Sequence, residues 1–92
     1  MNITWRPRAA DDFEELIALS SQGHAGNASR DKSLLENRIL QLVRFDQLGR
    51  KSRRIGVREL PIEGTPYVVV NRRLDDELLI IRIFHNGKAT LR

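Results

Sequence analysis

The stretch from residue 58 to residue 85 constrains the fold of this 92-residue chain most strongly. It holds two apolar runs rich in β-branched residues, Val68–Val70 and Leu78–Phe84, separated by the polar break Leu74–Glu77. Valine, isoleucine and phenylalanine favour strands and aspartate favours turns, so the break has the length of a hairpin connection. The stretch therefore predicts three antiparallel strands, which we place at 57–62, 66–73 and 77–86.

The residues before this stretch are patterned to cover a sheet. Asn2–Trp5 is a short strand-like segment, because Ile3 and Trp5 share a face at period two. Apolar residues then recur every three or four positions, which predicts helices at about 7–21 and about 28–46. The polar, glycine-containing break between them is short, so the two helices are expected to form an antiparallel helical hairpin. The predicted fold class is α+β, in which this hairpin packs on one face of the three-stranded antiparallel meander.

The connections carry two further signals. Gly64 is expected to turn the chain with a positive φ, and Asp75-Asp76 is expected to be a two-residue turn. The segment 46–56 is rich in cations and lacks periodicity, which predicts a basic surface loop. The tail, Gly87–Arg92, is expected to be loosely ordered.

Length and composition limit the classes of protein. Residues 1–92 fit a single small domain, and no apolar run approaches the ~20 residues of a membrane span. The N-terminus has no apolar signal-peptide core and the chain has no cysteine, so we expect a cytoplasmic protein without disulfides or thiolate metal sites. The net charge of +4 and the pI of about 10.3 favour acidic partners, either nucleic acid or an acidic protein segment.

A two-residue turn at Asp75-Asp76 predicts which side chains share each face of the sheet. Val68, Val70, Arg72, Leu79, Ile81 and Ile83 would face the helices. The opposite face would be left open, with a large apolar set around Arg82 that comprises Tyr67, Val69, Leu78, Ile80 and Phe84. Contiguous exposed apolar area marks an interaction site; the alternative is that the basic loop or the tail folds over it. A slip of one residue would exchange the faces of a strand, so this assignment depends on the turn length.

Catalytic chemistry has weaker support in the sequence. Cleavage of RNA without a metal needs a base, cations for the phosphate and an acid, which His85, Arg82, Lys88 and Glu59 are of the right types to supply. A lone histidine at a strand end is more often structural, and Arg82 beside Glu59 is expected to form a cross-strand ion pair. Two histidines without cysteines make a metal site improbable, so no metal and no cofactor is predicted.

Several motifs occur in a characteristic order along nearly the whole chain. They are Trp5-Arg-Pro-Arg-Ala-Ala-Asp-Asp-Phe13, Asp46-Gln-Leu-Gly-Arg50, Val57-Arg-Glu-Leu60, Gly64-Thr-Pro-Tyr-Val-Val-Val70 and Leu79-Ile-Ile-Arg-Ile-Phe-His85. In this order and spacing the chain resembles the RelE/ParE toxin superfamily, and most closely its ParE branch. The resemblance implies a toxin encoded beside an antitoxin that neutralises it with an extended acidic segment, and it allows a higher-order hetero-oligomer of the two.

The two branches of the superfamily imply different targets. ParE-like toxins poison DNA gyrase, whereas RelE-like toxins cut messenger RNA in the ribosome. RelE-type nucleases carry an arginine in the third strand, where this chain has Tyr67, and often a tyrosine after the last strand, which is lacking here. The chain also departs from the ParE pattern, because Asn71 stands where an aromatic is usual and the tail lacks the aromatic-proline ending.

The sequence therefore predicts a gyrase-binding toxin that is not an enzyme. A ribosome-dependent endoribonuclease is the alternative, and a degenerate member that only binds antitoxin is a third possibility. The expected partner-binding residues are Tyr67, Val69, Ile80, Arg82, Phe84, Arg50, Arg53 and Arg54.

Overall fold

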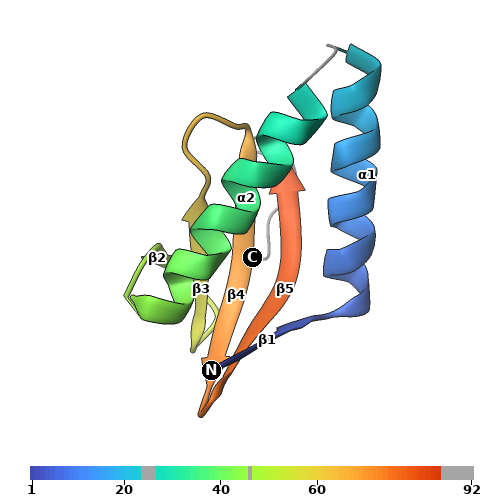
Figure 1. Cartoon of the computed structure of the whole chain (residues 1–92). Helices are drawn as coiled ribbons and strands as arrows, with labels where there is room; N and C mark the ends of the chain where they lie inside the picture. Colours follow the sequence, from blue (N-terminus) through green and yellow to red (C-terminus); the bar gives the residue numbers. More distant parts are fainter. Residues whose placement is uncertain (24–26, 46, 86–92) are drawn as a thin grey trace.

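The computed structural model describes residues 1–23, 27–45 and 47–85, and the side chains of 19–23 and 27 are not described. Within these described residues, two helices and five strands follow one another (Figure 1). Their bounds are β1 Asn2–Trp5, α1 Pro7–Gly23, α2 Asn27–Arg44, β2 Arg50–Lys51, β3 Val57–Pro61, β4 Tyr67–Leu74 and β5 Glu77–His85. The predicted helices and strands thus form close to their predicted bounds. The expectations for the tail and for Asn86 lie outside the described residues.

All five strands belong to one mixed sheet with the order β1-β5-β4-β3-β2. β3, β4 and β5 form the predicted antiparallel meander, but they are not the whole sheet. β1 adds to β5 in parallel, and β2 adds to β3 from within the predicted basic loop. The prediction of a three-stranded sheet was therefore wrong: β1 was expected as a short strand but not as part of this sheet, and the two residues of β2 are too few to show a strand pattern.

The two helices do not form a compact hairpin lying together on the sheet. α2 crosses the sheet face diagonally, whereas α1 runs beside the β5 border (Figure 1). α1 begins at Pro7, where a proline's missing N–H costs nothing. Neither described helix is long and apolar enough to cross a membrane. The helices lie close together near their connection and then diverge, which places different elements over the centre and the border of the sheet (Figure 1).

A bulge in the β4–β5 pairing overturns the predicted faces. Near the turn the predicted register is confirmed: Asp75-Asp76 is a two-residue turn, with Asp75 at φ 47°, and Arg73 faces Leu78. The register shifts between Val70 and Asn71, so that Val69 pairs with Ile83 and no longer with Arg82. One extra residue in β5 shifts every later pair by one position, so Arg82 and Phe84 lie on the face opposite to the one that strict alternation predicts.

The core shows that the predicted faces were also exchanged with respect to the helices. The side chains that pack with the helices come from the face predicted to be open, together with Ile83. Tyr67 is 9% exposed, and Val69 and Ile80 are fully buried. The main core cluster comprises Ala9, Leu16, Leu35, Ile39, Leu42, Leu60, Ile62, Tyr67, Val69, Leu78, Ile80 and Ile83.

Asp12 of α1 closes the border of the sheet where β1 ends. Its Oδ2 accepts hydrogen bonds from Arg82 Nε at 2.7 Å and from the Ile83 backbone N–H at 3.0 Å, and its Oδ1 accepts from Arg82 Nη2 at 3.2 Å. The hydrogen bonds from Arg82 to the Asp12 carboxylate raise the pKa of Arg82 above its ordinary value, against the opposing effect of burial. We call this arrangement the Asp12 clasp. It satisfies a strand N–H that would otherwise face solvent and fixes α1 to β5.

Candidate partner-binding surface

The residues predicted to bind a partner separate into three groups. Tyr67, Val69 and Ile80 are in the core, so the prediction that they form an exposed apolar face was wrong. The bulge explains part of the error. The rest arises because both faces of β4 and β5 are apolar, so that alternation alone does not indicate which face meets the helices.

Arg82 and Phe84 form the second group, on the face away from the core. Arg82 lies over the Phe84 ring, with its guanidinium carbon 4.7 Å from the ring centroid, and is held by Asp12. The predicted Arg82–Glu59 ion pair was wrong: Glu59 pairs with Arg50, whose Nε lies 3.3 Å from Glu59 Oε1. Because Arg82 is paired with Asp12 of α1, it holds the helix against β5 within the fold.

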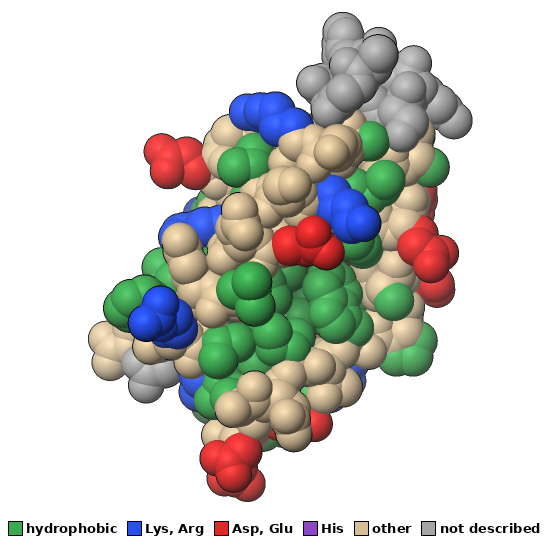
Figure 2. Space-filling view, viewed as in Figure 1, with side chains coloured by type: hydrophobic (Ala, Val, Ile, Leu, Met, Phe, Trp, Pro, Cys, Tyr) green, Lys and Arg blue, Asp and Glu red, His purple; other side chains and the backbone are tan. Residues whose placement is uncertain are grey.

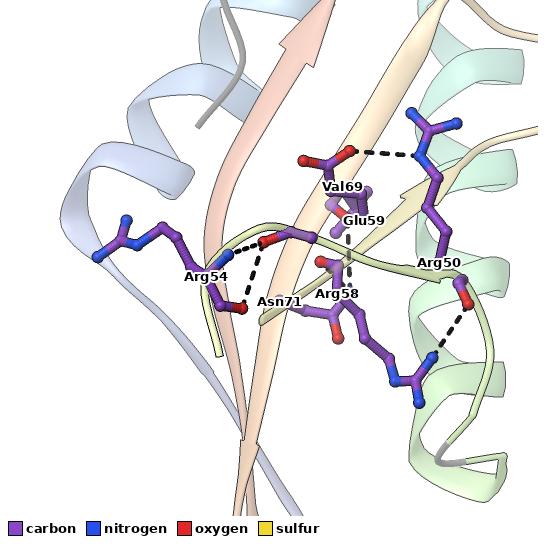
Figure 3. Close-up of polar contacts among 8 residues, drawn as sticks. Arg50, Arg54, Arg58, Glu59, Val69 and Asn71 are labelled. Atoms are coloured by element: carbon purple, nitrogen blue, oxygen red, sulfur yellow. Dashed lines mark hydrogen bonds and ion pairs between the residues drawn. The ribbon is translucent and has the colours of Figure 1, made fainter. Parts of the chain in front are cut away.

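Arg50, Arg53 and Arg54 form the third group, on an exposed hairpin. β2 and β3 pair through Arg50 with Glu59 and through Lys51 with Arg58. In Figure 3, Arg50 reaches Glu59 and Arg58 reaches toward the Gly49 carbonyl, while the Arg54 guanidinium points away from both. We call residues 50–58 the basic hairpin. At its tip, Ile55 is 96% exposed.

A hollow of about 590 Å³ lies at the C-terminal end of α2. Arg38 enters it with a buried Nε that finds no hydrogen-bond acceptor among the described residues, while its Nη1 donates to Gln41. Leu40 and Phe45 are each 58% exposed in this region of the chain. The hollow is lined by Arg38, Gln41, Arg44, Phe45, Gln47 and Leu48. A carboxylate beside an apolar group would complement such a surface.

Hydrophobic side chains also gather on the face that carries the helices, in the space between α2 and α1 (Figure 2). The apolar residues that pack against the core while keeping part of their surface exposed include Trp5 and Phe13, whose ring centroids lie 5.3 Å apart. The others are Ile3, Ile17, Leu34, Val43 and Leu48. The divergence of the helices therefore leaves an apolar area where a compact helical hairpin would have closed it.

The sequence interpretation missed Ile55, Leu40 and the hollow. Leu40 had a readable signal, because it falls outside the helical stripe of Leu35, Ile39 and Leu42. Ile55 had one too, since it is an isolated isoleucine among cations. The hollow had none, because it forms only where the end of α2 meets the segment that follows it.

The groups that a nuclease would require do not converge among the described residues. His85 pairs in register with Tyr67 on the core side, and the two rings meet edge-on at 5.8 Å. Glu59 and Arg82 each lie in register with Val70 on the opposite side, where they have different ion-pair partners. Lys88 lies outside the described residues. His85 and Glu59, the two described residues that could serve as base and acid, therefore lie on opposite faces of the sheet.

Comparison with known proteins decides the family. The model of a family described as the ParE toxin of the type II toxin–antitoxin system, parDE, matches residues 3–89. The chain belongs to this family. A search of curated protein sequences found no match.

Solved structures share the fold of this ParE-family toxin. A chain of the chromosomal ParDE TA system from P. aeruginosa is 24% identical, with a TM-score of 0.83 over 95% of this chain and 97% of that one. A copper-bound mutant toxin from Helicobacter pylori is 23% identical, with a TM-score of 0.67 over 92% and 93%. The isolated E. coli RelE toxin is 8% identical, with a TM-score of 0.66 over 96% and 86%. The resemblance to the superfamily is confirmed, and both branches share the architecture.

Proposed function

We propose that this ParE-family toxin inhibits DNA gyrase and is held inactive by a cognate antitoxin. Membership of the ParE family over residues 3–89 carries the proposal, because gyrase is the target that the ParE branch implies. The fold alone does not separate the branches, since RelE toxins share it. The distribution of polar groups supports binding over catalysis: His85 lies on the opposite side of the sheet from Glu59 and Arg82.

The antitoxin proposal draws on charge and apolar area together. An extended acidic segment would bury apolar side chains in the space between the helices and place carboxylates against Arg38 and Arg44 at the end of α2. Its remaining charges would be drawn to Arg50, Arg53 and Arg54, which keeps these residues as proposed partner contacts. An E. coli RelBE toxin–antitoxin complex shares this fold, with a TM-score of 0.66 at 8% identity.

A supercoiling assay tests the gyrase proposal. Purified toxin added to gyrase, ATP and relaxed plasmid is expected to lower the yield of supercoiled product and to accumulate cleaved DNA, and added antitoxin should restore activity. Intact supercoiling at a large excess of toxin would refute gyrase as the target. The His85→Ala variant serves as the matched test of the nuclease alternative. Unaltered toxicity of this variant supports binding, whereas ribosome-dependent mRNA cleavage that is lost on this substitution would favour the nuclease.

Antitoxin binding is tested separately from toxicity. Phe45→Ala is expected to weaken the complex about tenfold, because it removes an exposed ring beside the hollow. Leu74→Ala is the control, since Leu74 is also exposed but lies at the β4–β5 turn. The affinity should also fall as salt is raised. Equal effects of the two substitutions would place the antitoxin elsewhere, and light scattering of the complex would test the expected higher-order hetero-oligomer.

A further inference from the structure

The basic hairpin concentrates positive charge at one exposed site. Within nine residues it carries five cations, namely Arg50, Lys51, Arg53, Arg54 and Arg58. Glu59 offsets Arg50 only, and Arg58 donates to the Gly49 carbonyl oxygen at 3.2 Å without meeting a carboxylate. A sixth cation, Arg72, is close by, because a Cβ at Gly56 would lie 3.5 Å from its Nε. In the part of the chain that the structure describes, Lys51, Arg53, Arg54 and Arg72 form no ion pair.

The tip of the basic hairpin is held by its own hydrogen bonds. The Ser52 N–H donates to the Val57 carbonyl at 3.0 Å, and the Val57 N–H donates to the Arg54 carbonyl at 3.1 Å. The Ser52 hydroxyl oxygen accepts from the Arg54 N–H at 2.9 Å (Figure 3), and Gly56 adopts φ +80°. These bonds present the cations without the entropy cost of ordering a loop on binding.

An apolar apex stands among these cations. Ile55 exposes 96% of its surface, and exposed isoleucine at a tip packs against nothing in the fold. A hollow of about 360 Å³ is formed by residues 51–58 beside this apex. Some DNA-binding proteins contact phosphates on both sides of the minor groove and insert an apolar side chain between them. A projecting aliphatic side chain among cations is the arrangement that this mode of binding requires.

Other acidic partners fit the basic hairpin less well. An acidic peptide strand that extends the sheet needs an edge to pair with, and β2 offers only Arg50–Lys51. Single-stranded nucleic acid is held by aromatic stacking, and residues 50–58 contain no aromatic side chain. A duplex needs neither, because its closely spaced phosphates line a concave groove.

We propose that the basic hairpin binds double-stranded DNA, with Arg53 and Arg54 against backbone phosphates and Ile55 in the minor groove. This property goes beyond gyrase inhibition and is measured without gyrase, so either proposal can fail alone. An antitoxin that covers these arginines would also exclude the duplex.

The test measures fluorescence anisotropy of a short labelled DNA duplex titrated with full-length toxin across a range of salt concentrations. Wild-type toxin is expected to bind at low salt, with the logarithm of affinity falling linearly with the logarithm of salt. Each neutralised phosphate contributes about 0.9 to that slope, so Arg53→Ala/Arg54→Ala should reduce it by roughly 2. Ile55→Ser should lower affinity about tenfold with the slope unchanged.

The matched control is Arg6→Ala/Arg8→Ala, which removes the same charge from two exposed arginines at the start of α1. Urea denaturation would verify that each variant folds. The proposal is overturned if no duplex binds at low salt, or if the control reduces the slope as much as the hairpin variant does. Equal or tighter binding of single-stranded DNA or of an RNA duplex would also overturn it.

Discussion

Removal of the Asp12 carboxylate is expected to destabilise the toxin far more than removal of the adjacent Asp11 carboxylate. Asp12 accepts three hydrogen bonds from Arg82 and the Ile83 N–H, and the Asp12 and Arg82 side chains are only 16% and 19% exposed. An exposed ion pair contributes about 0.2–1 kcal/mol, and breaking a fully buried one costs about 3–5 kcal/mol. For this partly buried clasp we expect Asp12→Ala to lower the free energy of unfolding by about 2–3 kcal/mol.

The assay is urea denaturation of Asp12→Ala, Asp12→Asn and Asp11→Ala. Asp11 is exposed one residue earlier in the same helix, so its variant matches the loss of charge and the gain in helix propensity. Asp12→Asn keeps an oxygen acceptor for Ile83 and should lose about half as much. Near the midpoint of thermal unfolding, the Asp12→Ala loss corresponds to a fall in Tm of roughly 10–20 °C.

Two further measurements attribute the loss to the Asp12 clasp. A double-mutant cycle with Arg82→Ala is expected to give a coupling energy of about 1–2 kcal/mol. Hydrogen exchange of the Ile83 amide should accelerate in Asp12→Ala, because that N–H loses its acceptor. If Asp12→Ala and Asp11→Ala unfold within about 0.5 kcal/mol of each other, the role assigned to the clasp is wrong.

Three more predictions concern the core, the β2 turn and the end of α2, and urea denaturation checks each. Ile80→Ala should lower the free energy of unfolding by about 2–5 kcal/mol because Ile80 is fully buried, whereas Ile55→Ala at the exposed tip should change it by less than about 0.5 kcal/mol. Gly49→Ala should be about 1–2 kcal/mol more destabilising than Gly56→Ala, because both have positive φ but only a Cβ at Gly49 would lie 2.7 Å from the Glu59 carbonyl oxygen; equal losses would contradict that clash. Arg73→Met should cost about 1–2 kcal/mol, because its guanidinium donates to the Leu42 carbonyl near the end of α2, and a loss no larger than that of exposed Lys32→Met would contradict this role.

The candidate surface was only partly predictable. Arg50, Arg53 and Arg54 were recognisable as exposed, because four cations between residues 50 and 54 have few neighbours that could neutralise them. Arg82 was grouped with them as a partner contact, yet it bonds to Asp12 within the fold, as Arg73 bonds to the Leu42 carbonyl. Charge alone does not distinguish an arginine that stabilises a helix end or a sheet border from one that is free to bind.

Local periodicity determined the helices, the three long strands and the two-residue turn at Asp75-Asp76, because these depend on neighbours in the chain. The tertiary structure decided which face of the sheet meets the helices. Val68–Val70 and Leu78–Ile81 are apolar on both faces, so the choice depended on the bulge after Val70 and on which side α2 crosses. Both are set by packing between residues distant in sequence. For this reason Tyr67, Val69 and Ile80 lie in the core and not on the surface predicted from the sequence.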